Sequence, residues 1–245
     1  MNKVCVSLSG GVDSMVLLHT IVYEGIQNVS AIHINYNNRD TCNSEVQFVQ
    51  DYCDKLGVEL FVKHITEMNR KRDSSRKEYE ALTREIRFEE YRKQNCPILL
   101  GHNYEDTVEN IISNIASKKN YHNLRGMNHE TTERGVLIRR PFLEISKKDI
   151  YKYAEEHGIP HLTDSTPKWS RRGKLRDHVI PALETCEPNF IKGLLQIAND
   201  LEQNISFIQD HPESVTLPTN FVNVKNALYT ISNKTVHDYV RRVKN

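Results

Sequence analysis

The sequence predicts an α/β protein with a parallel five-stranded sheet, helices on both of its faces and a short helical C-terminal region. Short apolar runs rich in β-branched residues alternate with segments of helical periodicity through about residue 165. This alternation is typical of parallel sheets whose strands are joined by helices. A chain of 245 residues, 38% of them hydrophobic, is long enough for one such domain and an appendage.

Local patterns predict each element in order. The first strand, at residues 4–8, is a β-branched run that the glycines Gly10 and Gly11 interrupt. The helix at 146–157 has a start signal in Ser146, with Asp149 three residues later. The other expected strands are 29–34, 59–65, 97–100 and 136–138. The other expected helices are 13–23, 44–56, 79–91, 107–117, 175–184, 190–208 and about 234–243, with loops at 118–134 and 159–170.

Composition excludes several classes of protein. The formal net charge is only +1, so any surface that binds nucleic acid must be local. The five cysteines form no Cys-x-x-Cys pair, which argues against a zinc ribbon or a redox pair and favours a reducing compartment such as the cytoplasm. We expect no membrane contact, because no run approaches the roughly 20 apolar residues of a membrane span.

The segment after the first strand has the features of an anion site. It reads Ser9-Gly10-Gly11-Val12-Asp13-Ser14 and opens the next helix. Glycines allow a close backbone approach, and the amides at a helix N-terminus attract phosphate. Asp13 is unfavourable beside phosphate unless a cation such as Mg²⁺ shares the site. The alternative is a plain glycine turn, and a Walker A loop is excluded because no Gly-Lys-Ser/Thr follows.

This segment resembles the signature of the N-type ATP pyrophosphatases, the PP-loop superfamily. The resemblance implies a Rossmann-like fold of the adenine nucleotide alpha hydrolase (HUP) type. It also implies that the loop holds the pyrophosphate end of ATP and that ATP is cleaved between its α- and β-phosphates. The expected ligand-binding residues of the loop are Ser9, Gly10, Gly11, Val12, Asp13 and Ser14.

Further blocks resemble the tRNA(Ile)-lysidine synthases and the related tRNA 2-thiolation enzymes. They occur in the same order from about residue 4 to residue 183, which makes them more specific than any single motif. The blocks are residues 31–34, 84–88, 101–109, 124–127, 140–143 and 172–176, accompanied by Arg39, Asp164 and Pro181.

The resemblance extends the expected site beyond the first loop. It adds His33 and His102 to the ATP-binding residues. Asp106, at the carboxyl edge of the sheet, would share a Mg²⁺ with Asp13. Arg172 and Arg176 lie one helical turn apart and suit phosphate stabilisation or a tRNA backbone. The expected catalytic residues are therefore Asp13, Asp106, Arg172 and Arg176.

Blander interpretations remain for several of these residues. His102 could simply cap a helix, and Arg84 and Arg87 could form a solvated face. The segment 168–178 is locally basic, and its Trp169 could stack a base or merely pack.

The most specific function that the resemblance implies is the formation of lysidine on a wobble cytidine of tRNA, with ATP, Mg²⁺ and free lysine. Residues 1–185 would form the catalytic domain and residues 186–245 a helical extension, with a homodimer left open. Three departures from the family pattern, at Tyr36, Glu105 and Gly173, put the acceptor in doubt. The alternatives are a tRNA 2-thiolation enzyme with sulfur supplied by a partner, another adenylating enzyme such as an amidotransferase, and a non-catalytic nucleotide-binding regulator.

Overall fold

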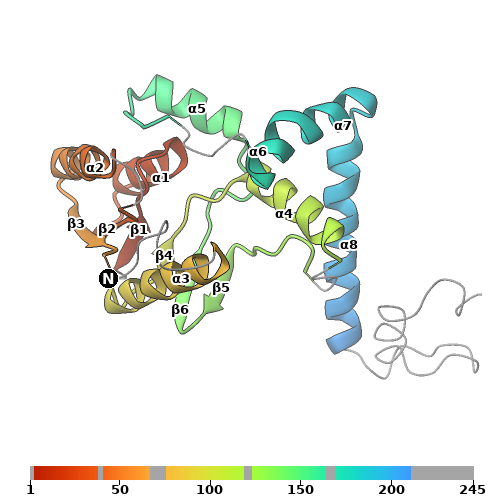
Figure 1. Ribbon diagram of the computed structural model, residues 1–245, viewed down its shortest axis with the longest axis horizontal. Helices are drawn as coiled ribbons and strands as arrows, with labels where there is room; N and C mark the ends of the chain where they lie inside the picture. Colours follow the sequence, from red (N-terminus) through yellow and green to blue (C-terminus); the bar gives the residue numbers. More distant parts are fainter. Residues whose placement is uncertain (1–2, 38–40, 67–75, 119–122, 164–168, 211–245) are drawn as a thin grey trace, which may run out of the picture. The chain divides into compact units, whose positions relative to one another are not determined.

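The computed structural model describes residues 3–37, 41–66, 76–118, 123–163 and 169–210. The chain divides into two compact units, Met1–Leu195 and Gln196–Asn245, and the elements that form the sheet all lie in the first (Figure 1). The predicted helix near 234–243 lies outside the described residues, as do Arg39, Asp164 and Lys168.

The described part of the chain contains one six-stranded sheet in the order β3-β2-β1-β4-β6-β5. The first five strands in this order are parallel to their neighbours, which confirms the predicted α/β class with its mostly parallel sheet. The strands are β1 (Val4–Ser7), β2 (Val29–Asn35), β3 (Glu59–His64), β4 (Ile98–Leu99), β5 (Glu130–Glu133) and β6 (Val136–Arg139).

The sixth strand corrects the prediction of five strands and of a loop at 118–134. Strand β5 pairs with β6 in an antiparallel hairpin whose two turn residues are Arg134 and Gly135. Both have positive φ, 50° and 78°, as a tight primed turn requires. The strand itself reads Glu-Thr-Thr-Glu, so it has no apolar run for a hydrophobic pattern to detect.

Helices cover both faces of the sheet, as predicted (Figure 1). On one face, α1, α2 and α5 pack against the strands through Leu17, Val49 and Ile150. On the other, α3 packs through Phe88 and Tyr91. The helices are α1 (Val12–Tyr23), α2 (Cys42–Leu56), α3 (Arg76–Lys93), α4 (Tyr104–Ala116), α5 (Lys147–Glu156), α6 (Arg171–Lys174), α7 (Ile180–Cys186) and α8 (Phe190–Asp210).

Between α6 and α7 the helix continues as a π-helical segment, Leu175–Val179. The predicted helix at 175–184 therefore begins earlier, at Arg171, because the hydroxyl of Ser170 accepts a hydrogen bond from Gly173 N and caps its first turn. No helix in the described ranges is both long and apolar enough to cross a bilayer.

The strand order places a switch point at the centre of the sheet. The chain leaves β1 toward β2 on one side, and β4 returns to pair with β1 on the other, with Val6 opposite Leu99. The loops after β1 and β4 therefore begin at adjacent strand ends. In open α/β sheets this crevice is where ligands bind.

Candidate active site

The loop after β1 is built around an unusual backbone conformation at Gly10. Its φ is +85°, and a Cβ there would lie 2.8 Å from Cδ1 of Leu162. The main chain of Leu162 donates to the Gly10 carbonyl oxygen at 2.9 Å, which fixes the loop against the segment after α5. The positive φ therefore favours glycine at this position, and any larger residue would also have to displace the Leu162 side chain.

Two serine hydroxyls brace the loop from inside. Ser9 N donates to Oγ of Ser14 at 3.1 Å, and that Oγ donates to the Gly11 carbonyl oxygen at 3.0 Å. Gly11 is the N-cap of α1 and has no side chain with which to cap it. The first turn of α1 thus has no side-chain cap, which leaves its amides suited to an anion, and their contact with phosphate stays a prediction.

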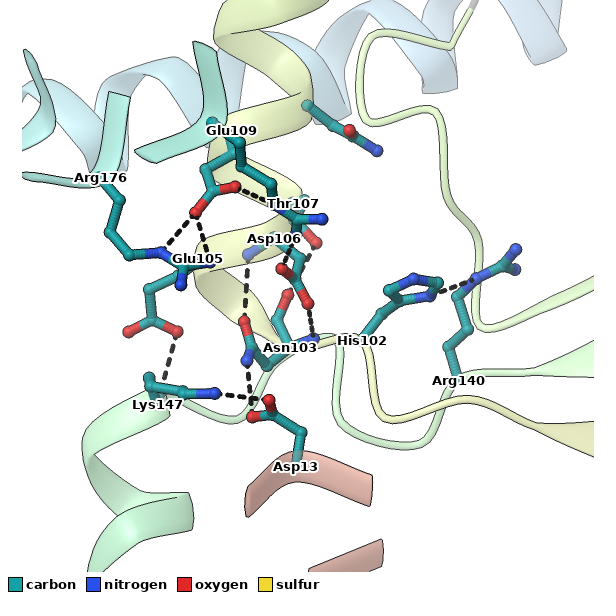
Figure 2. A network of polar contacts seen from close by, with 12 residues as sticks. Asp13, His102, Asn103, Glu105, Asp106, Thr107, Glu109, Arg140, Lys147 and Arg176 are labelled. Atoms are coloured by element: carbon teal, nitrogen blue, oxygen red, sulfur yellow. Dashed lines mark hydrogen bonds and ion pairs between the residues drawn. The ribbon is translucent and has the colours of Figure 1, made fainter. Parts of the chain in front are cut away.

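The loop after β4 comes very close to the loop after β1. A Cβ on Gly101 would lie 3.0 Å from the backbone carbon of Asp13, so any larger residue would push the two loops apart by a few tenths of an ångström. Helix α4 then begins with a capping box, in which Asn103 and Asp106 each bond the other's backbone N–H. The Asn103 side chain also donates from Nδ2 to Oδ1 of Asp13 at 2.9 Å (Figure 2). One asparagine side chain therefore connects the two aspartates that the sequence predicted to work together.

Each of these aspartates faces a cation in the structure. The Nζ atom of Lys147 lies 2.5 Å from Oδ2 of Asp13. Arg172 forms an ion pair with Asp106 through Nη2. Both carboxylates line the same cavity. Hard oxygen ligands of this kind suit Mg²⁺, which normally completes its shell with phosphate and water oxygens. Within the described ranges no three acidic, histidine or cysteine side chains gather as a metal cage.

A buried carboxylate on α4 holds the two predicted arginines. Glu109 is only 4% exposed in its side chain and forms ion pairs with both Arg172 and Arg176, the latter at 2.9 Å. Glu109 follows Asp106 by three residues, so both carboxylates project from one face of the helix. The structure thus brings Asp106, Arg172 and Arg176 into one cluster, with Glu109 as a member that the sequence had left without a role.

His102 is held as a neutral donor. Its Nδ1 accepts a hydrogen bond from Nε of Arg140 at 3.2 Å, so the ring proton lies on Nε2 (Figure 2). Burial lowers the pKa of His102 to about 4, and the charges of Arg140 and Arg172 act in the same direction against the opposing charge of Asp106. Asn103, not His102, caps α4, so the helix-cap interpretation of His102 is wrong.

We expect His102 to make the protein less stable as the pH is lowered from about 6.5 to about 4. In this window the unfolded chain binds more protons than the folded one, so the free energy of unfolding rises with pH. A shift of this size is worth at most about 3 kcal/mol. Urea unfolding at several pH values should give a shallower dependence for His102→Gln. An exposed control, His178→Gln, should match the wild type, and equal slopes for all three proteins would contradict the assignment.

The cavity at the switch point has a volume of about 590 Å³, within the range of small-molecule sites. Both loops contribute to its wall. The predicted residues that line it are Ser9, Gly11, Val12, Asp13, Ser14, His102, Asp106, Arg172 and Arg176. Other lining residues that the sequence gave no role include Lys147, Tyr151 and Arg140.

Other predicted residues lie in different settings. His33 is 4% exposed within β2, and its Nδ1 lies 2.8 Å from the carbonyl oxygen of Leu8; it is outside the cavity lining, and its contact with ATP stays a prediction. Arg84 and Arg87 line the cavity, and Arg87 lies close enough to donate to the Tyr36 hydroxyl at 3.5 Å. Trp169 is 64% exposed, which excludes the packing role.

The strand order, the glycine loop at the first strand–helix junction and the cavity beside it define a Rossmann-like α/β protein of the nucleotide-binding class. Residues 1–183 match the PP-loop domain family. The chain belongs to this family.

Named relatives and solved structures agree with this assignment. The chain is 30% identical over 217 residues to tRNA(Ile)-lysidine synthase of Neisseria meningitidis serogroup B, covering 85% of this chain and 49% of that protein. It is 30% identical over 210 residues to the enzyme of the same name in Bacteroides thetaiotaomicron, covering 82% of this chain and 47% of that protein. The chain thus spans about half the length of these relatives.

A similar solved structure is the U34-tRNA thiolase NcsA of Methanococcus maripaludis, with its [4Fe-4S] cluster. Its TM-score is 0.65 at 18% identity, and the match covers 82% of this chain and 72% of that one. At this identity the similarity concerns the fold alone.

Proposed function

We propose that this protein is an ATP-dependent tRNA-modifying ligase that forms lysidine on a wobble cytidine of tRNA(Ile) and releases AMP and pyrophosphate. The observation that carries the proposal is the cavity in which an open helix N-terminus faces a cluster of carboxylates and arginines. The names of the 30% identical relatives support this choice of substrate.

The proposed roles follow from where the side chains lie. Ser9, Gly10, Gly11, Val12 and Ser14 bind the β- and γ-phosphates through main-chain amides and hydroxyls. Asp13 and Asp106 hold Mg²⁺, which supplies charge neutralisation for the phosphates when it is bound. Arg172 and Arg176, already held by Glu109, stabilise the negative charge that develops during phosphate transfer.

The reaction would proceed in two balanced steps. The carbonyl oxygen at C2 of cytosine attacks the α-phosphate, which forms an O-adenylyl bond and releases pyrophosphate. The ε-amine of lysine then attacks C2, loses a proton and displaces AMP. His102 can donate its Nε2 proton as a hydrogen bond in this cavity without carrying charge, because its pKa is lowered to about 4. The cytidine must leave its stack to reach the cavity.

The exposed Trp169 supports a nucleic-acid acceptor rather than a small one. It directly precedes Ser170 and the basic segment of α6, Arg171–Lys174, which contains Arg172 of the site. An exposed indole beside guanidinium groups can stack an unpaired base. The division at residue 185, the role of His33, a cytoplasmic location and a homodimer stay predictions.

We expect AMP release to require lysine and tRNA together. The purified protein should be incubated with ATP, Mg²⁺ and tRNA(Ile) transcript, with and without lysine, and AMP should be quantified by chromatography. Lysine should raise the rate of AMP release by at least about 100-fold, because AMP leaves the adenylated cytosine only when the lysine amine attacks it. Ornithine, one methylene shorter than lysine, is the matched control for the attacking amine.

Other outcomes would identify the competing functions. AMP release that depends on sulfide instead of lysine would favour a 2-thiolation enzyme. Release with a small amide acceptor and no tRNA would favour an amidotransferase. Tight ATP binding without AMP under any of these conditions would favour a non-catalytic regulator.

A further inference from the structure

Lys147 lines the cavity beside the loop after β1, although no sequence motif marked it. It is the first residue of α5, and its Nζ lies 2.5 Å from Oδ2 of Asp13 (Figure 2). Its side chain and that of Asp13 are both 24% exposed, and both line the cavity together with Ser9 and Gly11. A lysine ammonium therefore lies within the cavity, beside the loop that would receive phosphate.

The backbone of Lys147 is held at the start of α5, and its side chain extends from there into the cavity. Its main-chain N–H donates to Oε2 of Glu105 at 2.8 Å, and the hydroxyl of Ser146 caps the helix from the preceding position. The ring of Tyr151, one turn further on, lies 5.5 Å from Nζ. The backbone contacts fix the base of the side chain, and its flexible four-carbon stem is long enough for the ammonium to reach another oxygen of the same cavity.

The contacts of Asp13 show that a metal ion would compete with Lys147 for its carboxylate. Both oxygens of its carboxylate have partners, Asn103 on Oδ1 and Lys147 on Oδ2. A divalent cation that binds Asp13 must take one of these oxygens. Displacement of Lys147 would leave an ammonium beside the phosphates, where its charge is most stabilising.

We propose that Lys147 is a phosphate-binding residue that neutralises Asp13 in the nucleotide-free protein and moves to the β- or γ-phosphate when the metal takes Asp13. This rests on the proposed function, because it needs the loop to bind a triphosphate. Lys147 then acts as a competitor of the metal before the nucleotide binds and as a ligand of the nucleotide afterwards.

The two halves of this role predict opposite changes in Lys147→Met. In the presence of Mg²⁺, pyrophosphate should bind more weakly by on the order of 10-fold, because one charge-assisted hydrogen bond is lost. Mn²⁺, a probe that takes the same oxygen ligands as Mg²⁺, should bind the nucleotide-free protein more tightly, because Asp13 no longer has a competing cation. Calorimetry measures the first affinity and electron paramagnetic resonance the second.

Controls separate this role from simple packing. Lys148→Met removes an exposed ammonium from the next position of α5 and should change neither affinity. Lys147→Gln can still donate a hydrogen bond to Asp13 and should keep the wild-type melting temperature, yet it should show both changes because its charge is gone. A purely structural Lys147 would be rescued by glutamine.

The proposal is overturned if the affinity for pyrophosphate does not fall in the two Lys147 variants. It is also overturned if the affinity for Mn²⁺ does not rise in them. These measurements use neither tRNA nor lysine, so they test Lys147 separately from the acceptor. A wild-type protein that binds no pyrophosphate would contradict the proposed function as well as the role of Lys147.

Discussion

Asp106→Asn is expected to lower AMP formation by about 100- to 1000-fold without unfolding the protein. Asparagine keeps an oxygen that can accept the hydrogen bond from Asn103 N, now at 3.1 Å, so α4 keeps its cap. It loses the charge that pairs with Arg172 and that would hold the metal. The assay is AMP release under saturating ATP, tRNA and lysine, together with a thermal melt.

Asp149→Asn is the matched control for this substitution. Asp149 occupies the corresponding position of α5, where its carboxylate accepts from the hydroxyl of the N-cap Ser146 at 2.5 Å. It is exposed and lies outside the cavity lining. The control should lose a little stability and no activity. Similar activities of the two variants would remove Asp106 from the catalytic residues.

Gly10→Ala should abolish measurable ATP binding, with a loss of affinity on the order of 100-fold. The new Cβ would meet Leu162 Cδ1 at 2.8 Å and Val49 Cγ1 at 3.4 Å, so the Leu162 side chain must move out of the loop. Alanine at a φ of +85° also costs about 1–2 kcal/mol. Both effects rotate the peptide groups of the phosphate loop away from the ligand.

Gly25→Ala separates the backbone cost from the steric one. Gly25 has a φ of +73°, close to that of Gly10, and a Cβ there would contact nothing within 4 Å. Both variants should therefore melt at lower temperature, and only Gly10→Ala should lose ATP in an equilibrium binding assay. Equal ATP affinities would show that the loop tolerates a side chain at position 10.

The elements of the fold that sequence could predict are those with apolar runs. Strands β1, β2 and β4 are buried along most of their length, and each has the apolar residues that mark a buried strand, although β2 also carries Ser30, His33 and Asn35. Strand β5 could not be predicted in this way, since its residues are polar and its place depends on the turn at Arg134 and Gly135. Two adjacent residues of positive φ are a property of the folded backbone, and an Arg-Gly pair is a weak signal for them.

In the candidate site, the residues that sequence could predict are those that lie in local motifs. Asp13, Asp106, Arg172 and Arg176 could be predicted because each lies in a recognisable block. Asn103 and Lys147 could not, because their contacts with Asp13 join residues 90 and 134 positions apart. No local spacing encodes such contacts. Glu109 had a signal that was available, its three-residue spacing from Asp106 on one face of α4.

The two hydrogen bonds of the Asn103 side chain imply that ligand binding near Asp13 and the stability of the first turn of α4 affect each other. Its single amide group contacts Asp13 through the nitrogen and the Asp106 N–H through the oxygen. Rotation of this rigid plane to follow one partner must disturb the other. Binding of a ligand that shifts Asp13 would therefore be coupled to the opening of the first turn of α4, with the same coupling free energy in both directions. Amide hydrogen exchange in that turn is expected to change when nucleotide binds.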